Sequence, residues 1–190
     1  RALQVVDEAY VEFAEPGETF ASVASSVGAL DNLIVLRTLS KAWALAGIRI
    51  GALLEKAEVI NLLRRIMPPY PLPAPCVDAA LRALSDAGAL TMEERCSQTR
   101  RERKRMRIAL ARLACVREVL PSQANFLTVR FHDAGAAWQA LRDAGVVARD
   151  VRRHPGLCDA LRITLGTPAE NDLVVTRLHA VGADRVASPA

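Results

Sequence analysis

A short apolar run near the start of the chain predicts a strand. Val5 and Val6 lead directly into Asp7, and a second apolar run occupies residues 33–36. The first run predicts a short strand that ends in a carboxylate. Because open α/β sheets display functional groups where their strands end, Asp7 is a candidate site residue.

The next apolar positions follow a helical spacing. Residues 53–67 predict a helix. Its expected inward positions are Leu54, Ile60, Leu63 and Ile66. Segment 68–73 predicts an extended loop, because its prolines lack a backbone donor and disfavour helix in the preceding residue. A second helix is predicted at 76–84, with an interruption at 86–88.

Charged residues dominate the middle of the chain. Segment 95–107 predicts a long solvated helix in which basic residues alternate with acids. Its expected buried stripe consists of Met106, Ile108, Leu110 and Leu113. We place a domain boundary at this helix, which gives one domain at 1–94 and a second at 95–190, made of the linking helix and a small C-terminal domain.

The C-terminal pattern predicts a small sheet with helices. Strands are expected at 116–120, 125–131, 146–148 and 161–166, and a helix is expected at 134–144. Thr167, Pro168 and Glu170 predict the start of a further helix, with threonine as its cap. Helices on one face of such a sheet make an α+β lobe.

Composition narrows the class of protein. Hydrophobic residues make up 51% of the 190 residues, yet no apolar run is long enough to cross a bilayer and no export signal opens the chain. We therefore expect a cytoplasmic protein that does not bind membranes. The net charge of +4 is concentrated at 95–107, where acids interrupt the basic residues, so nucleic-acid binding is not predicted. The four cysteines lack the spacing of a metal site or disulfide framework.

The main group of candidate functional residues lies in segment 38–51, which reads Thr-Leu-Ser-Lys-Ala-Trp-Ala-Leu-Ala-Gly-Ile-Arg-Ile-Gly. Apolar neighbours or the cation of Arg49 would favour the unprotonated amine of Lys41, which can form a Schiff base. Arg49 offers a planar fork to a phosphate, and Thr38 and Ser40 add hydroxyl donors. Together these groups suggest pyridoxal phosphate. Alternatively, Lys41 is a surface lysine at a helix start and Arg49 an ordinary charge at a strand edge.

The strand that ends at Asp7 supplies a second set of groups. A buried carboxylate keeps the ring nitrogen of such a cofactor protonated, and Asp7 is the candidate for that role. Tyr10 can reach the same ligand with its hydroxyl group. Alternatively, Asp7 caps the following turn and Tyr10 is half-buried packing.

Three motifs carry a family resemblance: Val-Asp-Glu-Ala-Tyr at 6–10, Thr-Leu-Ser-Lys-Ala at 38–42 and Leu-Ala-Gly-Ile-Arg-Ile-Gly at 45–51. They resemble the cofactor half of fold-type I pyridoxal-phosphate aminotransferases, most closely the histidinol-phosphate aminotransferases. The resemblance implies the fold class, which is α/β: the C-terminal part of a fold-type I PLP-dependent transferase, with a remnant of the large, mainly parallel domain followed by a small α+β domain.

The resemblance also implies roles for the residues of these motifs. Lys41 would be the Schiff-base lysine, and Asp7 would pair with the pyridinium nitrogen of pyridoxal 5'-phosphate. Tyr10 would contact the phenolic oxygen of the cofactor. Arg49 would bind the cofactor phosphate, with the hydroxyls of Thr38 and Ser40 close to it.

Three polar residues of the C-terminal lobe gain roles in the same way. An unpaired cation in the apolar strand at 161–166 would be costly, so Arg162 predicts an anionic partner. By resemblance, Arg162 binds the substrate carboxylate, Arg149 helps to hold the anionic end of the substrate, and Asn125 lines the site. The alternatives are a salt bridge from Arg162 to a core acid, and a surface pair of Arg149 with Asp150 or Asp143.

The chain opens at Arg1, almost inside a strand, so we expect a fragment that lacks the N-terminal half. The resemblance implies an aminotransferase of histidine biosynthesis that moves an amino group between histidinol phosphate and 2-oxoglutarate, with Lys41 as general base. Complete members of the family are homodimers. Trp43, Ala44 and Ala52 depart from the usual family residues and leave substrate choice open. The alternatives are another fold-type I enzyme, such as a threonine-phosphate decarboxylase, and an inactive folding or dimerisation fragment.

Overall fold

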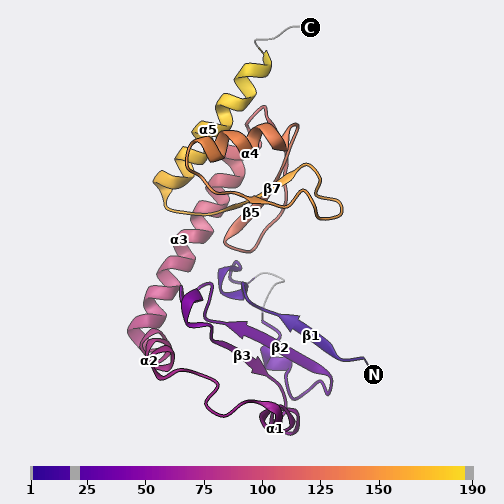
Figure 1. Cartoon of the computed structure of the whole chain (residues 1–190), viewed down its shortest axis with the longest axis vertical. Coiled ribbons are helices and arrows are strands. Elements are labelled where there is room, and N and C mark those ends of the chain that lie inside the picture. The colour runs from indigo at the N-terminus through magenta and orange to yellow at the C-terminus, as the bar shows by residue number, and fades with distance from the viewer. Residues whose placement is uncertain (1, 18–21, 187–190) are drawn as a thin grey trace. The chain divides into compact units, whose positions relative to one another are not determined.

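The computed structural model describes residues 2–17 and 22–186. The chain divides into two compact units, Arg1–Cys96 and Ser97–Ala190. Each unit contains its own sheet (Figure 1). Helix α3 (Asp86–Ala111) contributes residues to both units. Within the described ranges, no helix has the length and apolar character needed to cross a membrane.

The first unit is built on a three-stranded sheet in the order β1-β2-β3. Strand β1 (Gln4–Asp7) runs parallel to β2 (Leu33–Thr38), and β3 (Gly51–Leu54) runs antiparallel to β2. The apolar start of β2 is buried. The strand predicted to end at Asp7 is confirmed, and Asp7 lies beside Leu36 of β2.

Short helical segments surround this sheet. The 3-10 helices are η1 (Val11–Phe13), η2 (Ala24–Ser26) and η3 (Ala46–Ile48), and the α-helices are α1 (Ala57–Ile66), α2 (Ala74–Ala83) and the first part of α3. The prediction of one helix over 53–67 is wrong at its start, because residues 53 and 54 belong to β3. Pairing with β2 supplies their backbone hydrogen-bond partners, and that pairing is not visible in the local pattern. Ile66 is also not inward, since 79% of its surface is exposed.

Of the two predictions for the segments between helices, one is confirmed and one is wrong. Segment 68–73 is confirmed as non-helical, and Tyr70 within it has φ of 56° and is almost fully exposed. The expected interruption at 86–88 is wrong, because α3 begins at Asp86. The break lies one residue earlier, where the Oγ of Ser85 accepts a hydrogen bond of 3.3 Å from the backbone N–H of Gly88. Ser85 therefore acts as the helix cap.

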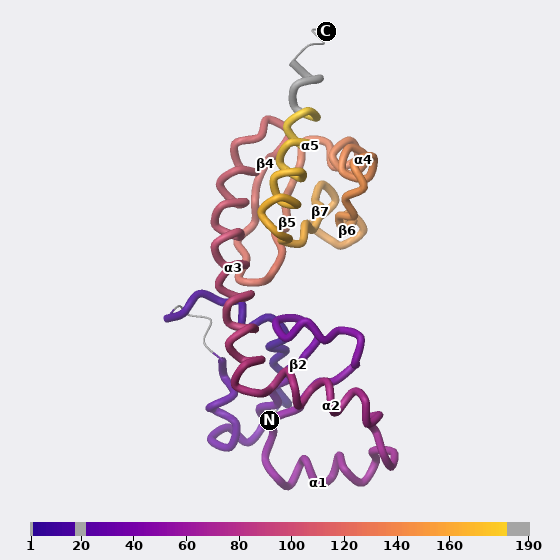
Figure 2. The backbone as a smooth tube through the Cα atoms, turned by 90° about the vertical axis from the view of Figure 1, so that its left-hand side faces the viewer, coloured from indigo at the N-terminus to yellow at the C-terminus, as the bar shows by residue number. Residues whose placement is uncertain are grey.

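The second unit is an antiparallel sheet in the order β4-β5-β7-β6 with helices on one face. Its strands are β4 (Val116–Val119), β5 (Phe126–Phe131), β6 (Arg149–Asp150) and β7 (Ala160–Thr164), and its helices are the end of α3, α4 (Ala134–Asp143) and α5 (Pro168–Val186). Alternate residues of β5 are buried against the helices, and α4 and α5 lie side by side (Figure 2). The predicted α+β lobe is confirmed.

Two predictions made from the sequence of this unit are corrected by the structure. The strand expected at 146–148 is wrong: β6 is the later pair Arg149–Asp150, and Val147 is 97% exposed. In the predicted stripe of α3, Met106 and Leu110 are fully buried, but Ile108 is 52% exposed. A position two residues from Met106 lies on the other side of a helix with 3.6 residues per turn, which explains the exposure of Ile108.

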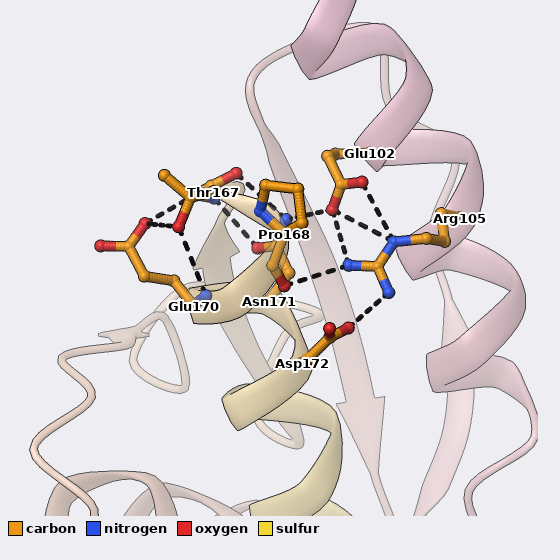
Figure 3. Close-up of polar contacts among 8 residues, drawn as sticks. Glu102, Arg105, Thr167, Pro168, Glu170, Asn171 and Asp172 are labelled. Carbon is orange, nitrogen blue, oxygen red and sulfur yellow. Dashed lines mark hydrogen bonds and ion pairs between the residues drawn. The ribbon is translucent and has the colours of Figure 1, made fainter.

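The predicted start of the last helix is confirmed. The backbone N–H of Thr167 donates to Glu170 Oε2 at 2.7 Å, and the N–H of Glu170 donates back to Thr167 Oγ1 at 3.4 Å (Figure 3). These reciprocal bonds satisfy backbone donors that the first turn of a helix leaves without partners.

Candidate active site

An open pocket of about 460 Å³ lies where β1 and β2 end and β3 begins. It brings together four of the predicted cofactor residues, which come from three separate stretches of the first unit. These residues are Asp7, Thr38, Ser40 and Arg49. Lys41 and Tyr10 are not among the residues that line it.

Two hydroxyls and a guanidinium occupy one part of the pocket lining. Thr38 Oγ1 lies 3.0 Å from Ser40 Oγ and accepts a hydrogen bond of 3.1 Å from the backbone N–H of Ser40. Arg49 is exposed and donates from Nη1 to the carbonyl of Ala46 at 3.2 Å. Its backbone has φ of 58° and ψ of 38°, a left-handed conformation that costs a non-glycine residue about 1 kcal/mol. Such strain is typical of functional loops.

Asp7 differs from its prediction in burial. Its side chain is exposed rather than buried, because the described residues leave the end of β1 uncovered. Asp7 Oδ1 accepts a hydrogen bond of 3.0 Å from the backbone N–H of Ala9, so the alternative in which Asp7 caps the following turn also holds. Oδ2 has no hydrogen-bond partner among the residues that the structure describes, and it remains available to a ligand.

Lys41 is held by its neighbours in the chain but is not covered by them. Ala42 is 3% exposed and packs in a cluster with Phe13 and Cys96, which anchors the loop. Lys41 itself is exposed, with Nζ 5.3 Å from the centre of the Tyr10 ring. The expected desolvation of Lys41 by the following apolar residues is therefore wrong for this chain. Trp43 and Leu45 line a different pocket, with α2 and α3.

Sequence reasoning missed an ion pair beside the pocket. Arg37 contributes to the pocket lining and bonds to Glu8, the residue that follows Asp7. The available signal was a single charge in the otherwise apolar run of β2, since a charge in such a position requires a partner.

The two predicted substrate arginines are register partners in the second unit. Arg149 of β6 lies opposite Arg162 of β7, so both side chains are on the same face of the sheet. That face is the one away from the helices, because Leu161 and Ile163 are buried in the helix-covered core. The guanidinium carbon of Arg162 lies 4.7 Å from the centre of the Phe126 ring, within range of a cation–π contact.

The predicted acidic partners of these arginines do not bind them. Asp150 instead pairs with Arg152 at 2.7 Å, and the hydrogen bonds from Arg152 lower the pKa of Asp150 to about 2. Arg162 and Arg149 have no ion pair with an acid in the described part of the chain, and the Nε of Arg162 is buried without a hydrogen-bond partner there. An exposed and a half-buried cation side by side suit an anionic ligand.

Asn125 also has its side chain available. Its backbone carbonyl accepts a hydrogen bond of 2.9 Å from the N–H of Leu165, which fixes the backbone at the start of β5. Its side-chain amide has no hydrogen-bond partner within residues 2–17 and 22–186. In those same ranges, no three residues among the histidines, cysteines and acids lie close enough to hold a metal ion.

The fold matches solved structures of aminotransferases. The structure of the histidinol-phosphate aminotransferase from Clostridium acetobutylicum superposes with a TM-score of 0.85 at 22% identity, covering 96% of this chain and 55% of that one. The enzyme of the same name from Sinorhizobium meliloti, solved in complex with pyridoxal-5'-phosphate, gives 0.80 at 29% identity, covering 96% and 49%. The fold is that of the fold-type I PLP-dependent aminotransferases.

The sequence comparison gives the family. The profile of aminotransferase class I and II matches residues 1–178, and the chain belongs to that family. Curated relatives named histidinol-phosphate aminotransferase include one from Xanthomonas euvesicatoria, 55% identical over 94% of this chain and 48% of its own length. Another, from Xylella fastidiosa, is 52% identical over 100% of this chain and 50% of its own length. The chain thus spans about half the length of the curated relatives it matches.

Proposed function

We propose that this chain carries the lysine-bearing part of a PLP-dependent aminotransferase that acts on histidinol phosphate and 2-oxoglutarate. The observation that carries the proposal is the pocket in which Asp7, Thr38, Ser40 and Arg49 meet. Local sequence does not require residues from three stretches to converge. The names of the curated relatives support the choice of substrates.

The groups in this pocket fit the cofactor in chemical type. A carboxylate, Asp7, suits the protonated ring nitrogen, while two hydroxyls and the guanidinium of Arg49 suit a phosphate. The Nζ of Lys41 would hold the cofactor covalently, and the Tyr10 hydroxyl would donate to its phenolic oxygen. Bound there, pyridoxal phosphate would supply an electron sink for the substrate α-carbon.

The chain's own residues would then move the proton. Lys41 Nζ would act as the general base that takes the proton from the substrate α-carbon. Asp7 would keep the ring nitrogen cationic throughout, since a carboxylate at that position favours the charged form of its partner.

The paired arginines of β6 and β7 supply an anion site of the kind these substrates need. Arg162 would bind a substrate carboxylate with its planar fork, while its stack on Phe126 holds the guanidinium in place. Arg149 would contact the second anionic group, which is the phosphate ester in histidinol phosphate. Asn125 would line the same site with its side-chain amide.

We further propose the organisation of the complete protein. Residues 1–94 would be a remnant of the large cofactor-binding domain, and residues 95–190 the linking helix with the small domain. The complete protein would be a cytoplasmic homodimer, by similarity to the family.

Adduct mapping tests the cofactor assignment directly, because within this chain only Lys41, Lys56 and Lys104 could carry the label. The assay uses the complete protein that contains this chain, or this chain co-expressed with the unmatched part of the Xanthomonas relative. We expect borohydride reduction after addition of pyridoxal phosphate to label Lys41. Lys41→Ala should lose the visible absorbance band and turnover, whereas Lys56→Ala, which removes a lysine paired with Asp31, should keep both. Label confined to Lys56 or Lys104 would refute the assignment.

Product analysis separates this function from the second candidate. The structure of L-threonine-O-3-phosphate decarboxylase from Porphyromonas gingivalis also matches, with a TM-score of 0.80 at 25% identity, covering 93% of this chain and 54% of that one. An aminotransferase converts 2-oxoglutarate to glutamate when given histidinol phosphate, whereas a decarboxylase releases carbon dioxide from a phosphorylated amino acid. If the chain is only an inactive folding or dimerisation fragment, the complete protein will label at Lys41 but the chain alone will not.

A further inference from the structure

A buried acid stands next to the pocket. Glu8 is only 7% exposed, although it follows the exposed Asp7 in the chain. Its carboxylate accepts three hydrogen bonds: 2.8 Å from Ser22 Oγ, 2.7 Å from the backbone N–H of Val23, and 2.8 Å from Arg37 Nε. A buried carboxylate with this many donors is fixed in position, because moving it would leave a buried charge without its hydrogen-bond donors.

All three nitrogens of the Arg37 side chain donate hydrogen bonds within this cluster. Nε donates to Glu8, Nη1 donates to Glu12 at 3.1 Å, and Nη2 donates to Ser22 Oγ at 2.9 Å. Each of its three nitrogens thus has a protein acceptor, and its single positive charge faces two carboxylates. Although Arg37 contributes atoms to the pocket lining, it is not free to bind an anion as Arg49 is.

Within the strands, the side chains of Glu8 and Arg37 lie on the opposite face from those of Asp7 and Thr38, although Arg37 also contributes atoms to the pocket at the strand ends. Asp7 is the register partner of Leu36, so its side chain shares a face with Leu36 and with Thr38 two residues on. Glu8 and Arg37, one residue along each strand, lie on the other face. Their ion pair therefore joins the ends of β1 and β2 directly behind Asp7 and Thr38.

We propose that Glu8 and Arg37 are positioning residues that fix the spacing between Asp7 and Thr38. This inference rests on the proposed function, in which Asp7 binds one end of the cofactor and Thr38 the other. The last backbone hydrogen bond between the two strands runs from the N–H of Glu8 to the carbonyl of Leu36 at 2.9 Å, and β1 ends there. The ion pair adds a side-chain restraint at this end of the strand pair.

The proposal is tested by comparing a ligand that contacts both sides of the pocket with a ligand that contacts only one side. Pyridoxal phosphate must reach both Asp7 and Thr38, whereas inorganic phosphate needs only the hydroxyls and Arg49. In the complete protein that contains this chain, Glu8→Gln and Arg37→Lys should each weaken pyridoxal phosphate at least tenfold, measured by absorbance titration. The same variants should change the dissociation constant of inorganic phosphate less than twofold, measured by calorimetry.

The matched control is Glu118→Gln, which removes an acid paired with Arg130 in the second unit and should leave both constants unchanged. The double variant of Glu8 and Arg37 should lose no more affinity than either single variant, because the two residues act as one pair. If Glu8→Gln does not fold, Arg37→Lys carries the prediction, since it keeps the charge and loses the fork.

Two outcomes overturn the inference while leaving the proposed function intact. One is unchanged pyridoxal phosphate affinity in both variants. The other is an equal loss for phosphate and for the cofactor, which indicates general disruption of the pocket. A failure of the proposed function looks different, because the unaltered protein and Glu118→Gln would then also fail to bind pyridoxal phosphate.

Discussion

The side-chain amide of Asn171 on α5 donates a hydrogen bond of 2.7 Å to the carboxylate of Glu102 on α3, across 69 residues of sequence (Figure 3). Both side chains are buried, and Asn171 is only 1% exposed. The same amide also bonds to both backbone groups of Gly166. Arg105 closes the network by donating to Glu102 at 2.7 Å and to Asp172 at 2.5 Å. The contact therefore fixes the start of α5 against α3.

Replacing Asn171 should destabilise the fold. In Asn171→Leu, the carboxylate of Glu102 loses a buried donor and Gly166 loses two partners, which we expect to cost about 2–3 kcal/mol. The measurement is urea unfolding of the 190-residue chain, followed by circular dichroism. Asn125→Leu is the matched control, because the described residues give that amide no partner, and it should stay within about 0.5 kcal/mol. Equal losses in the two variants would contradict the role of Asn171.

The same network predicts a dependence of stability on acid. The hydrogen bond from Arg105, and then that from Asn171, lower the pKa of Glu102 below its ordinary 4.5. A lowered pKa in the folded state means that the stabilisation is fully present above pH 4.5 and is lost as the pH falls through the lower value.

The unfolding free energy should therefore fall less steeply below pH 4.5 in Glu102→Gln than in the unaltered chain. Unfolding in urea at a series of pH values measures the two slopes. Parallel slopes would show that Glu102 is not a source of the acid sensitivity.

Substitutions at Arg49 and Ala44 distinguish the effect of backbone strain on stability from the effect of the Arg49 side chain on cofactor binding. Both have left-handed backbones, with φ of 58° and 56°. Glycine adopts this conformation without the steric cost, so Arg49→Gly and Ala44→Gly should each stabilise the chain by up to about 1 kcal/mol. Only Arg49→Gly should weaken pyridoxal phosphate in the complete protein, by about tenfold or more, because it removes the guanidinium from the pocket. Retained affinity in Arg49→Gly would exclude Arg49 as the phosphate ligand.

Lysine should not be able to replace Arg162 in substrate binding. A lysine keeps the positive charge but loses the planar fork and the stack on Phe126. In the complete protein, Arg162→Lys should raise the KM for glutamate about tenfold while kcat changes less than threefold. Arg117→Lys, at an exposed arginine paired with Asp159, is the control and should leave steady-state kinetics unchanged. A KM close to that of the unaltered protein would remove Arg162 from the substrate site.

Local sequence was sufficient wherever the hydrogen-bond partners are also local. The strand that ends at Asp7, the helix start at Thr167 and the proline-rich break at 68–73 all appear as predicted. The helix predicted over 53–67 failed at its start, because β3 finds its partners on β2, 13 to 19 residues earlier in the chain. A pattern within one segment carries no record of such a partner.

Taken alone, the sequence determined the candidate chemistry of this protein: the lysine motif, the carboxylate that ends β1 and the arginine that follows η3. Only the tertiary structure decided which of these groups meet. It brings Asp7, Thr38, Ser40 and Arg49 into one pocket, leaves Lys41 exposed beside Tyr10, and pairs Arg37 with Glu8. The physical reason is that residue types fix which bonds a side chain can make, while burial and pairing depend on packing between segments distant in sequence.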